Sequence, residues 1–320
     1  MRAFVVSALT EDVSAAALVE RPIPQPGPGE VCVRIKAAGV NFVDVLQAKG
    51  LHQHKPQPPY TPGFELAGDI SAIGEGVTDF SVGQAVWGAA RTGAYAEYGV
   101  AAVDRVSAMP AGMTYDEAAV FRAVYLTAHV SLVVRGRLQA GETLLVHGAA
   151  GGSGLAAVDL GRILGARVIA TASTQEKREF LAAYGAHHVL PAAGFRDAVK
   201  DLTGGRGADV VFDPVGGDVF DESTRCIAHD GRLLVIGFMS GRIPTLAANI
   251  ALIKGFAMIG VRAGEYGRQF PERGREIDAA LAQLAASGKA RIHIHRSYPL
   301  TQVRAAWAEL EDRRVIGKVV

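Results

Sequence analysis

The chain has 320 residues, and its 49% of hydrophobic and 20% of charged residues are ordinary for a globular protein of about two domains. The 33 lysines and arginines nearly balance 32 aspartates and glutamates, which argues against a nucleic acid or a membrane surface as the main partner. Two cysteines, Cys32 and Cys226, exclude a disulfide framework and a cysteine-rich zinc site. The first apolar run of the chain meets Glu11 and Asp12 at once, so it predicts a strand rather than a signal peptide, and we expect a cytoplasmic protein.

Residues 1–120 have the pattern of short β-strands. Runs such as RAFVVSA and EVCVRIKAAGV are separated by stretches rich in proline and glycine, for example RPIPQPGPGE, and helical periodicity is scarce. This pattern predicts a compact, barrel-like β domain. Strands of the same type return near the C-terminus after a helix-like segment, so we assign residues 1–120 and 263–320 to one domain.

Residues 121–262 alternate between apolar runs and amphipathic segments of helix length. TLLVHG (143–148) and RVIATAS (167–173) are predicted strands, and each is followed by a helix-like segment. Strands that lack polar alternation and are spaced by helices indicate buried parallel strands in βαβ units. The sequence therefore predicts an α/β fold, in which a doubly wound parallel sheet of the Rossmann type accompanies the β-barrel domain.

The strongest chemical signal is the segment LLVHGAAGGSGLAAVDLG, in which a predicted strand runs through a glycine-rich turn directly into a helix. A dinucleotide pyrophosphate needs the N–H groups of such a helix N-terminus, and Cβ atoms in the turn would obstruct its approach. Gly161, further along the helix, would allow close packing on the sheet. We predict that the cofactor-binding turn consists of Gly148, Gly151, Gly152, Ser153 and Gly154.

The end of the second Rossmann strand distinguishes the two nicotinamide cofactors. NAD-binding units place an acid there to hold the ribose 2′-OH, but this strand ends in Ala172 and Ser173 without one. Lys177 and Arg178 follow within one helical turn. A hydroxyl and cations suit a 2′-phosphate, which a carboxylate would repel, so we predict NADPH rather than NADH and include Ser173 and Lys177 in its site.

Taken together, these segments resemble the zinc-free quinone oxidoreductases, the zeta-crystallin-like branch of the medium-chain dehydrogenase/reductase superfamily. The resemblance covers nearly the whole chain and implies a GroES-like catalytic domain formed from both chain ends, a central Rossmann domain, and homodimers joined through the Rossmann sheets. It rests on AAGVNFVDVLQAKG (37–50), PYTPGFELAGDISAIGEGVTDFSVGQAVWG (59–88), GAYAEY (93–98), YLTAHVSL (125–132), AAGGSG (149–154) and DRRVIGKVV (312–320).

The resemblance also bears on metals. Where zinc-dependent relatives carry a histidine before a glutamate and, earlier, a cysteine, this chain has Phe64 and either Asn41 or Phe42. A phenyl ring offers zinc no lone pair, so we predict no metal and interpret Glu65 as a buried acid that accepts hydrogen bonds from backbone groups or an arginine. The two histidines of RIHIHR (291–296) are an alternative metal pair, but no cysteine or carboxylate accompanies them in the sequence.

Without a metal, hydride is delivered most easily to an acceptor that is already electrophilic. We therefore predict an NADPH-dependent oxidoreductase that reduces a quinone or another α,β-unsaturated carbonyl compound, whose product anion needs hydrogen-bond donors and a proton. Asn41 and Asp44 resemble the family's cofactor- and substrate-facing positions, and Thr127 resembles its hydroxyl near the nicotinamide. The structural alternatives are an Asx-turn at Asn41 and, for Thr127, a hydroxyl bonded back to a helix carbonyl.

Several positions depart from the family pattern. Tyrosines that are common in the segment matching LQAKGLHQHKP are replaced by Leu46 and His52, and His52 is either a proton donor or an exposed loop residue. Arg313 and Lys318 resemble residues near the cofactor in some relatives, although surface charges would look the same. An aromatic residue expected beside the third Rossmann strand is Pro191 here, so the 2′-phosphate pocket is not fully reproduced.

Two other functions remain open at this point. A zinc-type alcohol dehydrogenase would lose its activity when treated with a chelator. An NADPH-binding protein with little turnover would bind the cofactor tightly and reduce no conjugated acceptor.

Overall fold

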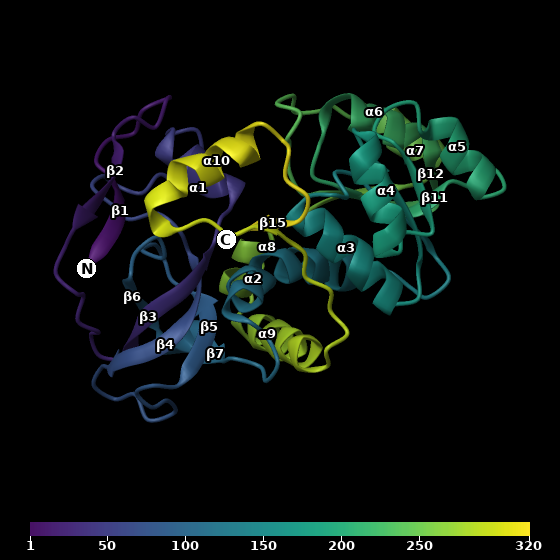
Figure 1. The fold of residues 1–320 in the computed structure, drawn as a ribbon. Coiled ribbons are helices and arrows are strands. Elements are labelled where there is room, and N and C mark those ends of the chain that lie inside the picture. The colour runs from purple at the N-terminus through teal and green to yellow at the C-terminus, as the bar shows by residue number, and fades with distance from the viewer. The chain divides into compact units, whose positions relative to one another are not determined.

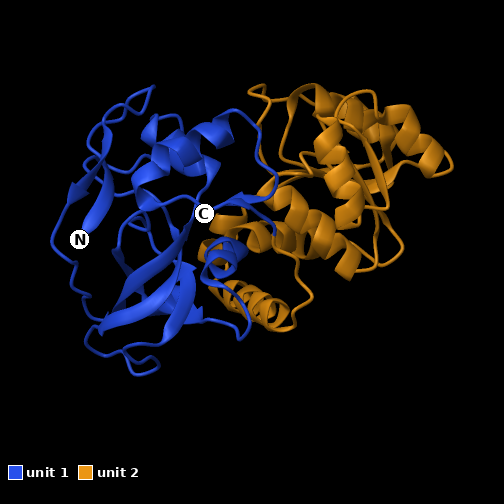
Figure 2. Cartoon of the chain, in the orientation of Figure 1, with its two compact units in different colours: residues 1–122, 293–320 blue, residues 123–292 orange.

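The computed structural model describes all residues from 1 to 320, and their contacts divide the chain into two units (Figure 2). Unit 1 comprises residues 1–122 and 293–320, and unit 2 comprises residues 123–292. Both ends of the chain therefore belong to unit 1, whereas unit 2 is one continuous segment.

Two helices group with unit 2, although the sequence pattern assigns residues 263–320 to the first domain. They are α8 (Ala263–Gln269) and α9 (Pro271–Ala286). The reason is local packing: α8 contacts η2 (Val130–Arg135), a π-helical segment of unit 2, and α9 contacts α8. The return to unit 1 begins only at residue 293.

The main sheet of unit 1 is antiparallel, and one of its faces is packed on a core that includes Val31, Leu66 and Val86. Gly39, the last residue of β3, is paired with Glu65, the first residue of β4, which brings two motifs of the sequence together. The strand order is β6 (Tyr98–Ala102), β3 (Glu30–Gly39), β4 (Glu65–Ile73), β5 (Ala85–Ala89) and β7 (Val106–Ala108).

The C-terminal segment completes unit 1. Val319 pairs with Val40, directly after β3, and the Trp307 ring packs edge-to-face on Phe4 with 5.4 Å between ring centroids. Helix α10 (Val303–Glu311) contacts α1 (Phe42–Ala48) (Figure 1). The remaining elements of unit 1 are β1 (Arg2–Val6), β2 (Ala16–Glu20), α1 (Phe42–Ala48), η1 (Val103–Arg105), β14 (Ile294–Arg296), η3 (Leu300–Gln302), α10 (Val303–Glu311) and β15 (Lys318–Val319).

The sheet of unit 2 is entirely parallel and has the strand order of the doubly wound Rossmann fold. From one edge to the other the strands are β10 (His188–Pro191), β9 (Arg167–Ala172), β8 (Thr143–Val146), β11 (Ala208–Asp213), β12 (Ile227–Val235) and β13 (Ala257–Gly260). The helices between them are α3 (Gly152–Ile163), α4 (Gln175–Tyr184), α5 (Arg196–Leu202), α6 (Gly217–Cys226) and α7 (Ala248–Lys254). The order reverses between β8 and β11, and folds of this type bind dinucleotides at the carboxyl ends of those strands.

One long apolar helix runs from α2 (Tyr115–His129) into η2. By length and composition this helix, Tyr115–Arg135, could cross a membrane, with a mean hydropathy of 1.4 in its most apolar window. However, 56% of that window is buried inside the protein, and core helices of soluble proteins meet the same criterion.

Candidate active site

The glycine-rich turn joins β8 to α3, as the sequence predicts. Gly148 has a φ of +56°, which favours glycine, and Gly151 immediately precedes α3. A Cβ on Gly154 would lie 2.3 Å from the Gly148 carbonyl oxygen, so no side chain fits at that position. The N–H groups at the start of α3 have no carbonyl partners within the helix, and they can bind a phosphate.

Close packing of α3 on the sheet depends on Gly161. A Cβ at this position would lie 2.6 Å from Leu144 Cδ2 and 3.2 Å from Val168 Cγ2, which belong to the adjacent strands β8 and β9. Because both side chains are fully buried, they have little room to move aside. The role that the sequence suggests for Gly161 is confirmed.

His147 was not singled out by its sequence context, yet it lies directly before the glycine-rich turn and is fully buried. The Ser223 hydroxyl donates to the Val219 carbonyl, so it accepts from His147 Nε2 at 2.8 Å, and His147 Nδ1 accepts from the Thr171 hydroxyl at 2.9 Å. Burial lowers the pKa of His147 from 6.5 to about 3. The ring is therefore neutral and connects the end of β8 to β9 and to α6 (Gly217–Cys226) beside the turn.

Ser173, Lys177 and Arg178 lie together at the carboxyl end of β9. Ser173 is exposed, and the Thr174 side chain caps α4 by accepting from the Lys177 N–H. The Arg178 guanidinium donates to the carbonyl oxygens of Ala172 and Ser173 at 3.3 and 3.2 Å. Hydroxyl and cationic groups thus flank the strand end at which an NAD-binding unit would carry an acid.

In unit 1, three side chains from distant parts of the sequence form a polar cluster after β3. The Asn41 amide donates to Glu65 Oε2 at 2.9 Å and, more weakly, to the Gly39 carbonyl at 3.3 Å. The Lys318 ammonium donates to Asn41 Oδ1 at 2.5 Å, to the Val40 carbonyl at 3.1 Å and to Glu65 Oε2 at 3.4 Å. Glu65 and Lys318 are both buried, so the cluster is an ion pair bridged by an amide.

These contacts add partners that the sequence does not reveal. Glu65 is buried, as expected, and it accepts from the Asn41 amide and the Lys318 ammonium. Lys318 uses its three N–H donors inside unit 1, which makes it a partner of Asn41 and Glu65 and not an open phosphate ligand. Asn41 also has both amide hydrogens engaged, so an outside acceptor would have to replace the weaker bond to Gly39.

Asp44 does not face outward, since only 1% of it is exposed. Its Oδ2 accepts from the Tyr95 hydroxyl at 2.7 Å and from the Asn41 backbone N–H at 3.0 Å. Burial raises the pKa of Asp44 from 3.8 to about 7, although these two hydrogen bonds and Lys318 act in the opposite direction. Asp44 therefore positions the start of α1, where Asn41 lies.

Three other predicted site residues stand apart from this cluster. The Thr127 hydroxyl donates back to the Ala123 carbonyl at 2.8 Å, which is the structural alternative for this residue. His52 is partly exposed, and its Nδ1 lies 3.1 Å from both the backbone nitrogen and the carbonyl oxygen of His54. Arg313 is exposed in the turn after α10, with a φ of +55°.

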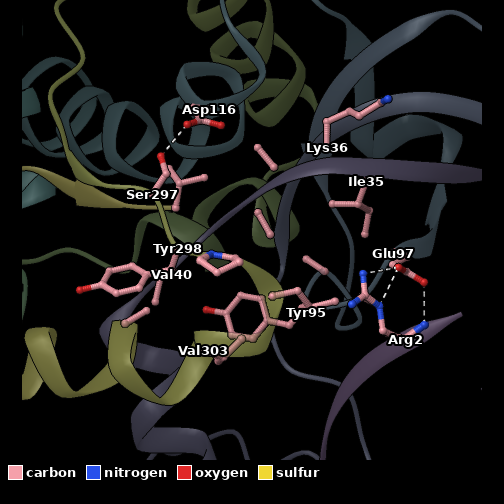
Figure 3. A pocket seen from close by; sticks show the side chains of 18 residues that line it. Arg2, Ile35, Lys36, Val40, Tyr95, Glu97, Asp116, Ser297, Tyr298 and Val303 are labelled. Atoms are coloured by element: carbon pink, nitrogen blue, oxygen red, sulfur yellow. Dashed lines mark hydrogen bonds and ion pairs between the residues drawn. The ribbon is translucent and has the colours of Figure 1, made fainter. Parts of the chain in front are cut away.

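A cavity of about 380 Å³ in unit 1 contains none of the predicted site residues. Figure 3 shows the Arg2–Glu97 ion pair on one side and Ser297 bonded to Asp116 on the other, with Tyr95 between them; Val40 and Val303 also line the cavity. Tyr95 lines this cavity and also donates to Asp44, so it connects the cavity to this buried acid of α1.

The side chains offer no group of three or more histidines, cysteines, aspartates or glutamates that could hold a metal ion. Phe64 precedes Glu65 at the position where the resemblance would require a histidine. In RIHIHR, the Nε2 atom of His295 lies 3.5 Å from Glu309 Oε2, a contact to a single carboxylate that does not make a metal ligand set.

Two family models match the chain. Residues 27–127 match the alcohol dehydrogenase GroES-like domain, and residues 152–282 match a family described as zinc-binding dehydrogenase. The second family is named for zinc binding, but Phe64 and the neighbouring residues of this chain provide no zinc ligand set.

Relatives match over the whole length. The bovine quinone oxidoreductase-like protein 2 is 34% identical over 98% of this chain and 91% of its own length. The chain belongs to the quinone oxidoreductase branch of the medium-chain dehydrogenase/reductase superfamily. It is thus an oxidoreductase with a GroES-like domain and a Rossmann domain.

Solved structures of this branch superpose closely. A mycobacterial protein whose structure is described as complexed with NADPH has a TM-score of 0.91 and 33% identity, covering 100% of this chain and 99% of the other. The quinone oxidoreductase of Escherichia coli complexed with NADPH has a TM-score of 0.91 and 27% identity over 100% of both chains.

Proposed function

We propose that this chain is an NADPH-dependent oxidoreductase that transfers hydride to a quinone or another α,β-unsaturated carbonyl compound without a metal. The observation that carries the proposal is the glycine-rich turn between β8 and α3, in which a Cβ on Gly154 would lie 2.3 Å from the backbone of Gly148. Packing alone does not require a helix N-terminus whose N–H groups are left open. A pyrophosphate, in contrast, binds to such groups.

The residues present fit NADPH. Gly148, Gly151, Gly152, Ser153 and Gly154 would hold the pyrophosphate, while Ser173 and Lys177 beside β9 would hold the 2′-phosphate, with Arg178 close by. When bound, the nicotinamide supplies the hydride. Relatives described as complexed with NADPH support the choice of cofactor.

Metal independence is supported by the surroundings of Glu65. The Lys318 ammonium lies 3.4 Å from its carboxylate, so a cation already neutralises this acid, and a second cation there would be repelled. Without a Lewis acid, the carbonyl must be activated by conjugation, which favours quinones and enones over simple ketones.

The residues of unit 1 have separate roles in this proposal. Lys318 and Glu65 fix both ends of the Asn41 amide, and Asp44 fixes its backbone N–H, so Asn41 is oriented before any substrate arrives. His52, which is partly exposed and has its Nδ1 bonded to the backbone of His54, is the candidate donor of the proton that the product anion needs. Thr127 and Arg313 remain candidates for secondary cofactor contacts.

We also propose a homodimer that is soluble in the cytoplasm. Strand β13 is the outer strand of the sheet and is exposed, with Met258 53% accessible. Leu252 and Ile253 on the preceding helix are 82% and 73% accessible. An unpaired edge beside large apolar side chains is suited to pairing with a second copy.

The experiment that tests the function measures oxidation of NADPH and of NADH by chelator-treated protein, with a simple quinone and a simple enone as acceptors. We expect turnover that prefers NADPH and is unchanged by the chelator. Loss of activity after chelation would instead indicate a zinc-type dehydrogenase. Tight binding of NADPH with no turnover on either acceptor would contradict the reductase and favour a binding protein.

A further inference from the structure

A second glycine turn lies beside the first at the carboxyl edge of the sheet. Strand β11 ends at Asp213, and residues 214–217 turn into α6 with φ values of +68° at Gly216 and +57° at Gly217. A Cβ on Gly148 would lie only 3.3 Å from Pro214 Cγ, so the two turns are in contact. They follow β8 and β11, the neighbouring strands between which the strand order reverses.

The carboxylate of Asp213 organises this second turn. Its Oδ1 accepts from the backbone N–H groups of Val215 at 2.8 Å and Gly216 at 2.9 Å. Asp213 is 1% exposed, and its other oxygen, Oδ2, is buried without a hydrogen-bond partner. Burial raises the pKa of Asp213, while the two N–H donors lower it. A buried acid with an unpartnered oxygen costs stability, so its presence at this position calls for a role other than packing.

A third segment, residues 236–242, is bonded to the same turn. The Met239 N–H donates to the Pro214 carbonyl at 3.1 Å, the Ser240 N–H donates to the Val215 carbonyl at 2.9 Å, and Ile236 bonds to the carbonyl of Asp213. In the other direction, the Gly217 N–H donates to the Arg242 carbonyl at 3.2 Å. The position of this segment therefore follows the position of the turn.

We propose that Asp213 is a positioning residue for the dinucleotide site. It holds residues 214–217 against Gly148, and through them residues 236–242, so that the wall facing the phosphate-binding turn is in place before the cofactor arrives. The proposal rests on the proposed function, because it assumes that the switch point between β8 and β11 binds NADPH. Removing the Asp213 carboxylate would loosen this wall. Part of the free energy of NADPH binding would then be spent on ordering it.

The test compares direct titrations of NADPH into the cofactor-free protein. We expect Asp213→Ala, which loses both N–H bonds, to weaken the Kd roughly tenfold, and Asp213→Asn to stay within about threefold because its carbonyl oxygen still accepts both of them. At saturating NADPH, the kcat of Asp213→Ala should stay within about twofold, since no reacting atom is touched. Hydrogen exchange in the cofactor-free Asp213→Ala protein should be faster in residues 214–217 and 236–242.

Glu142→Ala is the matched control. Glu142 is also a carboxylate that accepts a backbone N–H from its own turn, from Gln139 at 2.9 Å, and it pairs with Arg232. It precedes β8 and so lies at the amino edge of the sheet, opposite Asp213. This variant should lose stability but keep the wild-type Kd for NADPH.

The outcomes separate the two proposals. If wild-type protein does not bind NADPH, the proposed function fails, whereas the hydrogen-exchange comparison still tests whether Asp213 holds the turn. If wild type binds and Asp213→Ala binds equally well, or if Asp213→Asn is as weak as Asp213→Ala, the positioning role is wrong. Should Asp213→Ala not fold, Gly216→Ala disturbs the same turn, because its Cβ would lie 3.1 Å from Phe238 Cδ1. An unchanged Kd for Gly216→Ala would then overturn the inference.

Discussion

Glu65 and Asp44 are two buried carboxylates of unit 1 whose hydrogen-bond partners differ. Glu65 accepts from an ammonium and an amide, so its negative charge is compensated. Asp44 is bonded to the Tyr95 hydroxyl and a backbone N–H, both neutral, and Tyr60 lies close to it. Burial therefore dominates at Asp44 and raises its pKa to about 7.

The variant Asp44→Asn tests the state of this acid. The unfolded chain ionises near 3.8, whereas the folded protein keeps the proton up to about 7, so the folded state binds more protons between these values. The stability contributed by this group is full below about pH 4 and is lost as the pH rises towards 7. Relative to Asp44→Asn, which mimics the protonated form, wild type should lose at most roughly 4 kcal/mol over this range.

Urea unfolding of both proteins at several pH values measures this difference. Asp12→Asn is the control, because Asp12 is exposed and the hydrogen bonds from Ser14 lower its pKa. Its difference from wild type should have the opposite sign, with wild type gaining stability as the pH rises. Parallel pH profiles for wild type and Asp44→Asn would show that Asp44 is ionised in the folded protein.

At the scale of elements, α3 connects the cofactor site to the sheet. Its N-terminus carries the glycine-rich turn, and its middle lies close on β8 and β9 at Gly161. The distance between helix and sheet therefore sets where the phosphate-binding N–H groups lie. Alanine is normally the better helix residue by about 1 kcal/mol, so a glycine in the middle of a helix indicates a steric demand.

Gly161→Ala should destabilise the protein despite that intrinsic preference. The added Cβ would lie 2.6 Å from Leu144 Cδ2 in a fully buried layer, and overpacking of this kind costs roughly 1–3 kcal/mol. Thermal or urea unfolding measures the change. Gly264→Ala in α8 is the control, since no atom lies within 4 Å of its added Cβ, and it should be neutral or stabilising. Equal effects of the two substitutions would contradict a packing role for Gly161.

At the scale of the whole molecule, the two edges of the unit 2 sheet differ. Strand β10 ends in Pro191, which has no N–H to offer a further strand. Strand β13 has no proline and is largely exposed, and several accessible apolar residues belong to the segments around it: Met239, Ile243, Leu252, Ile253 and Met258. Only the β13 edge is therefore suited to pairing.

The double variant Leu252→Asp with Met258→Asp should convert the proposed dimer into monomers. Buried charges at a homodimer interface repel their symmetry copies and are costly to desolvate. Light scattering after size-exclusion chromatography measures the mass of each species. Val82→Asp alters an equally exposed apolar residue of unit 1, 63% accessible, and should leave the mass unchanged. A wild-type protein that is monomeric at all concentrations would contradict the dimer.

Much of the fold and the cofactor turn could be predicted because their signals are local. The alternation of apolar runs and helices determines a parallel sheet, and Gly148, Gly154 and Gly161 each report a backbone constraint within one βαβ unit. Phe64 likewise excludes a zinc ligand by its chemistry alone. These features need no knowledge of distant contacts.

Long-range contacts decided the rest. Lys318 reaches Glu65 from 253 residues further along the chain, and Tyr95 meets Asp44 across the interior of unit 1, so neither partner follows from local pattern. Local pattern also does not place α8 and α9, which belong to unit 2 because α8 packs on η2. Nor does it reveal the role of Asp213, whose turn contacts Gly148 only because β8 and β11 lie side by side. Periodicity and turn chemistry specify elements, whereas the protonation and pairing of buried groups depend on what the folded chain brings beside them.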